Sequence, residues 1–289
     1  MTEIWKLRAT KLGEKFAQEQ NITALPVKPI EIAEKLDILV ESLPPEKKGV
    51  SGMLLYGGNH FGIKYATYID NIGFQNFCIG HELGHYKLPG HYEQLMSSGC
   101  HVSSAGFISG DRYELEADHF SAGFLMPSYL FDKVLNNAKC GLKAIETLST
   151  ECETSLTATA IRYAQQSPDP LAIVVSEGQI INYCFMSDEM KEIKDLSWIK
   201  KGSKLDSNTV TSNFNRSKNN ILNGNRAEGE TTLLDWFGSN LPYELNEEVV
   251  GLGVYGKSLT VLTLDSLPDQ EELDEEDEMV DSWTPKFKR

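Results

Sequence analysis

The residues with the clearest chemical potential lie in the segment His81–His85, which has the sequence HELGH. The segment falls within residues 73–87, an apolar run whose spacing predicts a helix. Two histidines four positions apart lie on one helix face, about 6 Å apart along the axis, so both imidazoles can reach one zinc ion. Zinc lowers the pKa of water toward ~7, and Glu82, slightly to the side, can accept the proton while the water attacks a peptide carbonyl. The pattern therefore predicts a zinc site with Glu82 as catalytic base.

A catalytic zinc site needs a third protein ligand and one open coordination position. His91 is one candidate, because it follows His85 by six residues, as in the pattern HExxHxxGxxH. The glycine that lets the chain turn in that pattern is replaced here by Leu88, so we expect His91 to be an ordinary loop residue. Glu114 is the other candidate, on a second expected helix that can pack across the first, and we favour it.

Two more carboxylates follow on that second expected helix. Asp118 lies one turn after Glu114 on the same face, where it can accept a hydrogen bond from the outer ring nitrogen of a zinc histidine and fix its tautomer. Glu116 lies about 200° around the helix from Glu114, and we expect it to be a solvated charge. The position of Asp118 is the reason to prefer Glu114 over Glu116 as the third ligand.

Several other polar residues lie near the motif in sequence. Tyr86, Tyr113 and His119 each have a side chain that can stabilise the oxyanion of a tetrahedral intermediate, and the sequence does not choose among them. Cys100 and His101 offer metal-ligating atoms, but we favour core packing or a loop position for both.

The elements that must position these residues indicate an α+β fold. Before the motif, the sequence predicts helices at 3–20 and 30–36 and strands at 38–41, 52–56 and 61–65. The strands should form a small antiparallel sheet, or part of one, with a hairpin turn at 57–59. Residues 91–110, rich in Ser and Gly, are expected to form a loop with short turns.

The sequence Ser-Pro-Asp-Pro at 167–170 is a break, and the expected secondary structure changes there from helices to strands. Before it, helices are expected at 112–126, 128–137, 142–152 and 155–165. After it, strands are expected at 171–176, 180–185, 249–254 and 259–264. Residues 203–230 are polar and are expected to be a loop. These elements predict a second α+β domain from about residue 169 to residue 266.

Composition limits the class of partner. The 289 residues include 27 basic and 42 acidic ones, with a formal charge of −15. Nine acidic residues lie between Pro268 and Asp281, so the rest of the chain carries −6. An acidic body disfavours binding to nucleic acid and favours a basic protein partner. No apolar stretch approaches the ~20 residues of a membrane span, and the N-terminus lacks the apolar region of an export signal. Five cysteines without a CxxC pair then indicate free thiols and a cytoplasmic location.

Motifs along most of the chain resemble those of the ImmA/IrrE metallo-endopeptidases. The resemblance includes FQNFCIGHELGHY at the metal motif, E-x-E-A-D-x-F-x-A from Glu114, and the Leu-Met-Pro that starts at Leu125. It extends to SLTATAIRYAQQSPDPLAIVVS and to VYGKSLTVL near the end of the chain. One departure is Ser121, where the family usually has alanine, and this small-for-small change should be harmless.

The resemblance implies a zincin-like fold in which His81, His85 and Glu114 bind Zn²⁺ and Glu82 is the base, with Mn²⁺ as an alternative occupant. Members of this family typically cleave a helix-turn-helix (XRE-type) transcriptional repressor in phage, mobile-element or stress-response circuits. The C-terminal half resembles the GAF-type, sensor-like half of IrrE-like members.

We therefore expect four regions in the chain. They are a zincin-like metallopeptidase domain at 1–138, a helical linker resembling a helix-turn-helix at 139–168, a GAF-like sensor domain of α+β type at 169–266, and an acidic disordered tail at 267–289.

Two alternatives to a peptidase remain. One is a non-catalytic antirepressor that binds a repressor without cutting it, and the intact Glu82 argues against this. The other is a regulator that binds DNA directly through residues 144–165. That segment has a single basic residue, Arg162, whereas helices that contact DNA are rich in Lys and Arg, so we favour a packing role for it.

Overall fold

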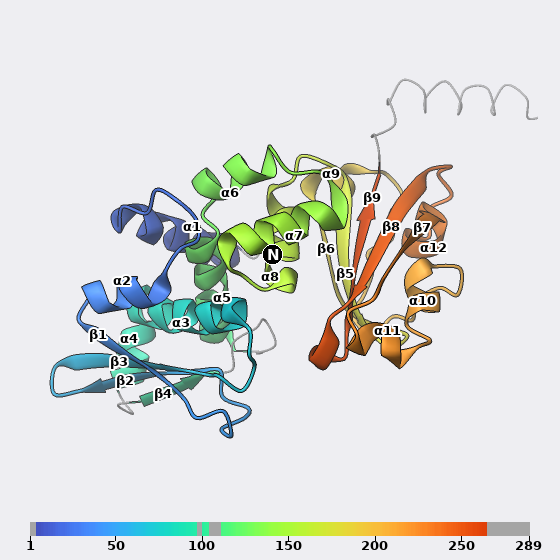
Figure 1. Ribbon diagram of the computed structural model, residues 1–289. Helices are drawn as coiled ribbons and strands as arrows, with labels where there is room; N and C mark the ends of the chain where they lie inside the picture. Colours follow the sequence, from blue (N-terminus) through green and yellow to red (C-terminus); the bar gives the residue numbers. More distant parts are fainter. Residues whose placement is uncertain (1–3, 97–99, 104–110, 265–289) are drawn as a thin grey trace, which may run out of the picture. The chain divides into compact units, whose positions relative to one another are not determined.

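The computed structural model describes residues 4–96, 100–103 and 111–264, and its backbone contacts divide the chain into two compact units, 1–166 and 167–289. Helices and two separate sheets within the described residues confirm the α+β class (Figure 1). The zincin-like and GAF-like layouts, the linker at 139–168 and the other domain bounds stay predictions. The expected acidic tail, 267–289, lies outside the described residues.

The first unit contains a mixed four-stranded sheet in the order β1-β3-β2-β4. Its strands are β1 (Ile38–Ser42), β2 (Gly52–Gly57), β3 (His60–Tyr65) and β4 (Cys100–Ser103). The β2–β3 hairpin is confirmed, but β1 runs parallel to β3, so the expected purely antiparallel sheet is wrong. Strand β3 lies between β1 and β2 in the sheet, although it follows both of them in the sequence. Alternation of side chains does not encode this neighbour order.

Eight helices of the first unit lie within the described residues. They are α1 (Ile4–Glu19), α2 (Pro29–Lys35), α3 (Ile72–Lys87), α4 (His91–Met96), α5 (Arg112–Leu125), α6 (Ser128–Leu135), α7 (Gly141–Cys152) and α8 (Leu156–Gln166). All seven expected helices that precede residue 166 are present within two or three residues of the expected bounds. The expected loop at 91–110 is wrong where it contains α4 and β4, because each is too short to show a period. Residues 97–99 and 104–110 lie outside the described residues.

Helix α5 is packed against both α1 and α3, and glycines make the approach to α1 close. A Cβ atom at Gly13 would collide with the Phe120 carbonyl oxygen, and one at Gly123 would collide with that of Thr10. Beside these contacts, the ring of Phe16 packs on Phe120 and Phe124, with centroids 5.7 and 5.1 Å apart. These contacts fix the position of α5 along α1, and α5 carries Glu114 and Asp118.

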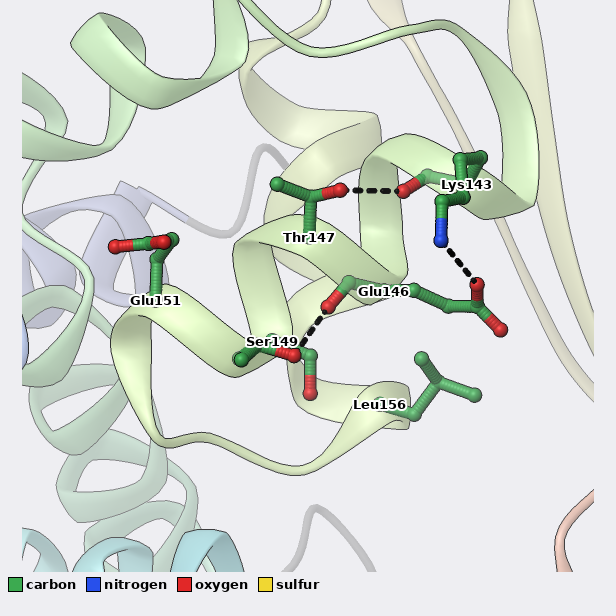
Figure 2. A pocket seen from close by; sticks show the side chains of 7 residues that line it. Lys143, Glu146, Thr147, Ser149, Glu151 and Leu156 are labelled. Atoms are coloured by element: carbon green, nitrogen blue, oxygen red, sulfur yellow. Dashed lines mark hydrogen bonds and ion pairs between the residues drawn. The ribbon is translucent and has the colours of Figure 1, made fainter.

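Helices α7 and α8 form a pair joined by a tight turn in which Glu153 adopts a left-handed conformation, φ 48°. Figure 2 shows the groove on this pair. Its lining side chains are mostly polar and come from Lys143, Glu146, Thr147, Ser149, Thr150, Glu151 and Leu156. Arg162, the one basic residue of segment 144–165, is only 3% exposed and is ion-paired with Glu14 of α1. It is therefore part of the packing of α8 and faces no solvent.

The second unit contains a five-stranded antiparallel sheet in the order β6-β5-β9-β8-β7. Its strands are β5 (Leu171–Glu177), β6 (Ile180–Met186), β7 (Arg226–Thr232), β8 (Glu244–Gly251) and β9 (Ser258–Thr263). The expected strands at 171–176, 180–185 and 259–264 are confirmed, whereas the one expected at 249–254 lies earlier, at 244–251. The expected loop at 203–230 is wrong. It contains α10 (Val210–Phe214), α11 (Lys218–Leu222) and β7. The helices are one turn long, and β7 is a polar edge strand, so none shows the apolar period of a buried element.

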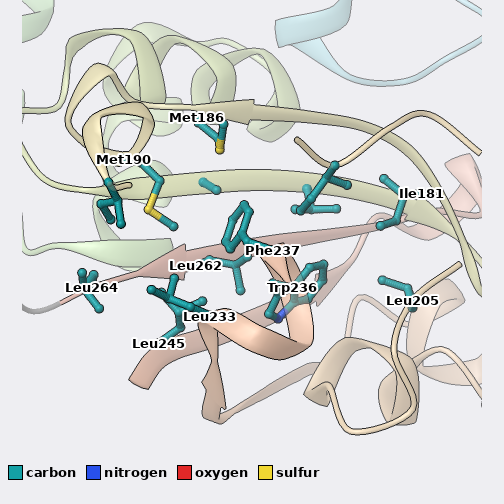
Figure 3. Close-up of a cluster of buried hydrophobic side chains, with 14 residues drawn as sticks. Ile181, Met186, Met190, Leu205, Leu233, Trp236, Phe237, Leu245, Leu262 and Leu264 are labelled. Carbon is teal, nitrogen blue, oxygen red and sulfur yellow. The ribbon is translucent and has the colours of Figure 1, made fainter. Parts of the chain in front are cut away.

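A hydrophobic cluster covers one face of this second sheet, with side chains from the strands, from α9 (Asp188–Glu192) and from α12 (Leu233–Phe237). Figure 3 shows Met190, Leu233, Trp236 and Phe237 directed toward strand residues such as Leu262. A smaller cluster contains Phe214, Ile221 and Val249. A short 3-10 helix, Gly253–Tyr255, joins β8 to β9. The second unit thus has a hydrophobic core of its own.

Within the described residues, no helix combines the length and the apolar composition that crossing a membrane requires.

Candidate metal centre

The candidate centre is formed by two capped helices. The Asn71 side chain accepts a hydrogen bond from the backbone of Phe74 and caps α3, and Asp111 caps α5 by accepting from Tyr113. Capping satisfies backbone N–H groups that the first helical turn leaves unpaired. Helix α3 is buried along the segment that contains the motif, and α5 packs against it.

His81 and His85 of α3 and Glu114 of α5 lie together. Ligand-capable atoms of the three side chains all lie within 4.8 Å of one another. The two Nε2 atoms are 3.0 Å apart. From Glu114, one carboxylate oxygen is 3.6 Å from the His81 Nε2 and the other is 3.1 Å from the His85 Nε2. The structure thus brings the three predicted ligands to one point.

Asp118 contacts the outer nitrogen of His81. Its carboxylate lies 2.8 Å from the His81 Nδ1, and both side chains are fully buried. A carboxylate accepts, so Nδ1 of His81 carries a proton, and the Nε2 of His81 faces His85 and Glu114. This is the arrangement in which a carboxylate orients a metal histidine.

The two histidines of the cluster have pKa values shifted in opposite directions. Burial acts to lower the pKa of His81, but Asp118 and Glu114 raise it to about 10. Burial lowers the pKa of His85 to about 3, and the adjacent His81 adds to this shift. The two Nε2 atoms, 3.0 Å apart, lie beside the Glu114 carboxylate. Two histidines and a glutamate are also a donor set of catalytic zinc sites, so the residues present fit a divalent metal ion.

Glu82 lies on α3 against the sheet and is fully buried. Its Oε1 atom occupies the place that a Cβ atom at Gly52 of β2 would take, and Gly52 pairs with Ser103 of β4. Neither Glu82 oxygen makes a hydrogen bond of good geometry with a described residue, and the neighbouring Ser103 hydroxyl acts to lower the pKa of Glu82. Burial raises the pKa of Glu82 to about 7, although His81 opposes the shift.

His101 of β4 belongs to the same cluster, although its sequence favoured packing or a loop. Its Nε2 lies 2.7 Å from the Glu114 Oε1, and its ring centroid is 4.3 Å from that of His85. Its side chain is 27% exposed, whereas those of His81 and His85 are buried. A four-residue strand gives no periodic signal that could have placed His101 here.

His91 and Glu116 also differ from their sequence interpretation. His91 is the first residue of α4 and is 1% exposed, so it is not a loop residue in solvent. Its Nδ1 lies 3.0 Å from the Nδ1 of His85, and its Nε2 lies 3.1 Å from Glu116. Both ring nitrogens of His91 thus face other groups. Gly90, with φ 85°, makes the turn that brings His91 back to α3.

The three oxyanion candidates lie in different surroundings. Tyr86 packs edge-on against Phe61, with centroids 4.9 Å apart. Tyr113 is 38% exposed and faces the His91 ring at 4.9 Å. His119 is buried and packs against Trp5. The choice among them stays open, and the roles assigned to His81, His85, Glu114, Glu82 and Asp118 stay predictions.

The fold and this cluster define a mixed α+β unit with a buried His-His-Glu group on two packed helices. Residues 70–163, which include every residue of that group, match the family model described as the IrrE N-terminal-like domain of peptidase family M78. Over this segment the resemblance to the ImmA/IrrE metallopeptidases is confirmed.

A transcriptional regulator from Mycobacterium tuberculosis has a similar fold, with a TM-score of 0.56 and 13% sequence identity. The match covers 89% of this chain and 76% of the other. At this identity the likeness concerns the fold alone. No curated protein matches the chain.

Proposed function

We propose that the chain is a zinc-dependent endopeptidase that cleaves a helix-turn-helix (XRE-type) transcriptional repressor at a specific site. The observation that carries the proposal is the Glu82 carboxylate, buried and without a hydrogen bond of good geometry to any described residue, one position from a His81–His85–Glu114 cluster. A buried acid of this kind beside a metal-type donor set is typical of a catalytic base.

In this proposal His81, His85 and Glu114 hold the ion, and Asp118 orients His81 through Nδ1. The ion, when bound, acts as a Lewis acid that polarises the scissile carbonyl and makes water acidic. Zinc suits two imidazoles and a carboxylate, and Mn²⁺ is an alternative occupant.

Glu82 accepts the proton of the attacking water and passes it to the leaving amide nitrogen. A base works best when its pKa is near the pH at which it acts, and burial places the pKa of Glu82 at about 7. His101 lies against the Glu114 carboxylate and is partly exposed, so it joins Tyr86, Tyr113 and His119 as a candidate for oxyanion stabilisation.

The proposed substrate rests on the family and on charge. Outside the acidic segment 268–281 the chain still carries −6, which favours a basic protein over nucleic acid. The buried Arg162 leaves segment 144–165 without an exposed basic side chain, which argues against DNA binding through it. We place the reaction in the cytoplasm, in a phage, mobile-element or stress-response circuit, with the GAF-like region as its sensor.

The test uses any helix-turn-helix repressor found in the neighbouring reading frames. Purified wild type and the Glu82→Gln variant are each incubated with it and with Zn²⁺ or Mn²⁺, and the products are measured by mass spectrometry. We expect a discrete pair of fragments from the wild type only. Equal metal content and equal circular dichroism of the two proteins would show that only the base was lost.

Two outcomes favour the alternatives. If the Glu82→Gln variant binds the repressor and relieves repression as well as the wild type does, the chain is an antirepressor. A salt-dependent shift of duplex DNA by this chain alone would favour a direct DNA-binding regulator.

A further inference from the structure

We infer that His91 and Glu116 are positioning residues for His85, forming a hydrogen-bonded relay that orients this metal histidine as Asp118 orients His81. The inference rests on the proposed metal site. It extends that site to α4 and to a second carboxylate of α5.

The hydrogen bonds of the relay can be assigned in one direction, from His85 through His91 to Glu116. If the His85 Nε2 lone pair faces the ion, the His85 Nδ1 carries a proton and donates it to the Nδ1 of His91, 3.0 Å away. The Nε2 of His91 must then carry the other proton, which it donates to Glu116 at 3.1 Å. Glu116 accepts a further hydrogen bond from the Nε of Arg112 at 2.9 Å. Each group thus has one role.

The surroundings keep His91 in the form that the relay needs. His91 is 1% exposed, and its ring lies between the rings of His85 and Tyr113. Because the Nε2 of His91 faces a carboxylate and must donate to it, the Nδ1 lone pair of the ring is left to accept from His85. A neutral His91 with both nitrogens engaged cannot also be a ligand.

The two histidines of the motif are therefore supported differently. His81 meets a carboxylate directly at 2.8 Å, whereas His85 meets a carboxylate through an inserted imidazole. Arg112, at the end of the relay, has a 67% exposed side chain and shares the charge of Glu116. Glu116 therefore supports His85 more weakly than Asp118 supports His81, and the relay ends at the protein surface.

The test is the affinity of the full-length protein for Zn²⁺, measured by competition with a chromophoric chelator. Loss of an outer partner of a metal histidine typically weakens metal binding 10- to 100-fold, so we expect about that loss for His91→Phe. His91→Gln should keep most of the affinity, because its amide oxygen can accept from His85 and its NH₂ can donate to Glu116. Glu116→Ala, at a partly exposed position, should weaken binding less and provides a second variant if His91→Phe does not fold.

Ser121→Ala is the matched control, since its hydroxyl donates to the Phe77 carbonyl between the same two helices and lies outside the relay. It should lower stability and leave zinc affinity unchanged. A spectroscopic readout is the ¹⁵N spectrum of the imidazoles in the zinc-loaded protein, in which we expect His91 protonated at Nε2 and His85 at Nδ1.

Four outcomes decide the inference. Unchanged zinc affinity in both His91→Phe and Glu116→Ala, or a His91 protonated at Nδ1, would overturn the relay. A wild type that binds no zinc would overturn the relay and the proposed function together. Zinc binding that depends on His91, in a protein that cleaves no repressor, would support the relay and contradict only the proposed peptidase.

Discussion

The position of Glu82 depends on a residue that has no side chain. The Glu82 Oε1 fills the space where a Cβ of Gly52 would lie, so Gly52→Ala must displace the carboxylate, which is the flexible partner in the collision. We predict a fall in kcat of about 100-fold, the loss that a misplacement of ~1 Å can cause, with unchanged zinc content. Turnover of the repressor and zinc per chain are the measurements.

Gly57→Ala is the control for this variant. Gly57 ends the same strand, and a Cβ there meets no described atom within 4 Å. Its turnover should equal that of the wild type. Wild-type turnover in Gly52→Ala as well would show that catalysis does not depend on this position of Glu82.

The sequence identified those site residues whose relation is local. His81, Glu82 and His85 share one helix, so a fixed spacing of four residues places the two imidazoles together. His91 and His101 are different, because a turn after α3 and a four-residue strand carry them to the cluster. Gly52 has no functional atoms at all. Their positions follow from tertiary packing, which residue spacing does not record.

At the scale of elements, α1 and α8 are joined by a buried ion pair between Glu14 and Arg162. Burial raises the pKa of Glu14, but hydrogen bonds from Lys11 and Arg162 outweigh it and hold the pKa below its usual 4.5. Arg162 also donates to the Met126 carbonyl at the end of α5. The pair therefore connects three helices of the first unit through one guanidinium group.

This pair predicts a pH dependence of stability. A carboxyl whose pKa is lowered on folding stabilises the protein fully above its unfolded pKa and loses that contribution as the pH falls through the folded one. We predict that wild type exceeds Glu14→Gln in free energy of unfolding by a constant amount near pH 7, and that the difference shrinks below pH about 4.5. Urea denaturation of both proteins between pH 7 and pH 3 measures it.

Glu19→Gln on the same helix is the comparison, since the Lys15–Glu19 pair is exposed at 69% and 52%. Exposed pairs contribute little, so this variant should differ from the wild type by less than about 1 kcal/mol throughout. A Glu14→Gln difference that stays the same at pH 3 and at pH 7 would contradict the assigned role of the carboxylate.

Element length also explains what the sequence predicted about the fold. The long helices α1 and α5 show their period over several turns, and the long helix α3 is apolar and buried along most of its length. The apolar strands β5 and β9 are also buried along their length. The missed elements are one-turn helices such as α10 and the polar edge strand β7. For these, position is decided by packing partners far away in the sequence, and local pattern carries little information.

At the scale of the whole molecule, all proposed metal ligands lie in the unit 1–166. The second unit contains a different buried polar group, the Glu247 carboxylate. Glu247 of β8 is fully buried, and its carboxylate accepts hydrogen bonds from the backbone of Val210 and Thr211 and from the Nε1 of Trp236. It joins the start of α10 and the helix α12 to the sheet. The stabilities of the two units thus depend on different chemistry.

We therefore predict that metal removal and loss of Glu247 act on different unfolding transitions. Zinc at 100 times its Kd stabilises the unit that binds it by about 2.7 kcal/mol, so chelation should lower the transition of the first unit only. Glu247→Ala removes the acceptor of three donors, of which the Thr211 N–H and the Trp236 Nε1–H are buried. Each buried donor left unpaired costs about 1–3 kcal/mol, so this variant should lower the transition of the second unit only. Differential scanning calorimetry of the full chain, with zinc and with EDTA, measures both unfolding transitions. The control is Glu244→Ala, at an exposed position of the same strand, which should change neither transition. A shift of both transitions by EDTA would show instead that the two units unfold together.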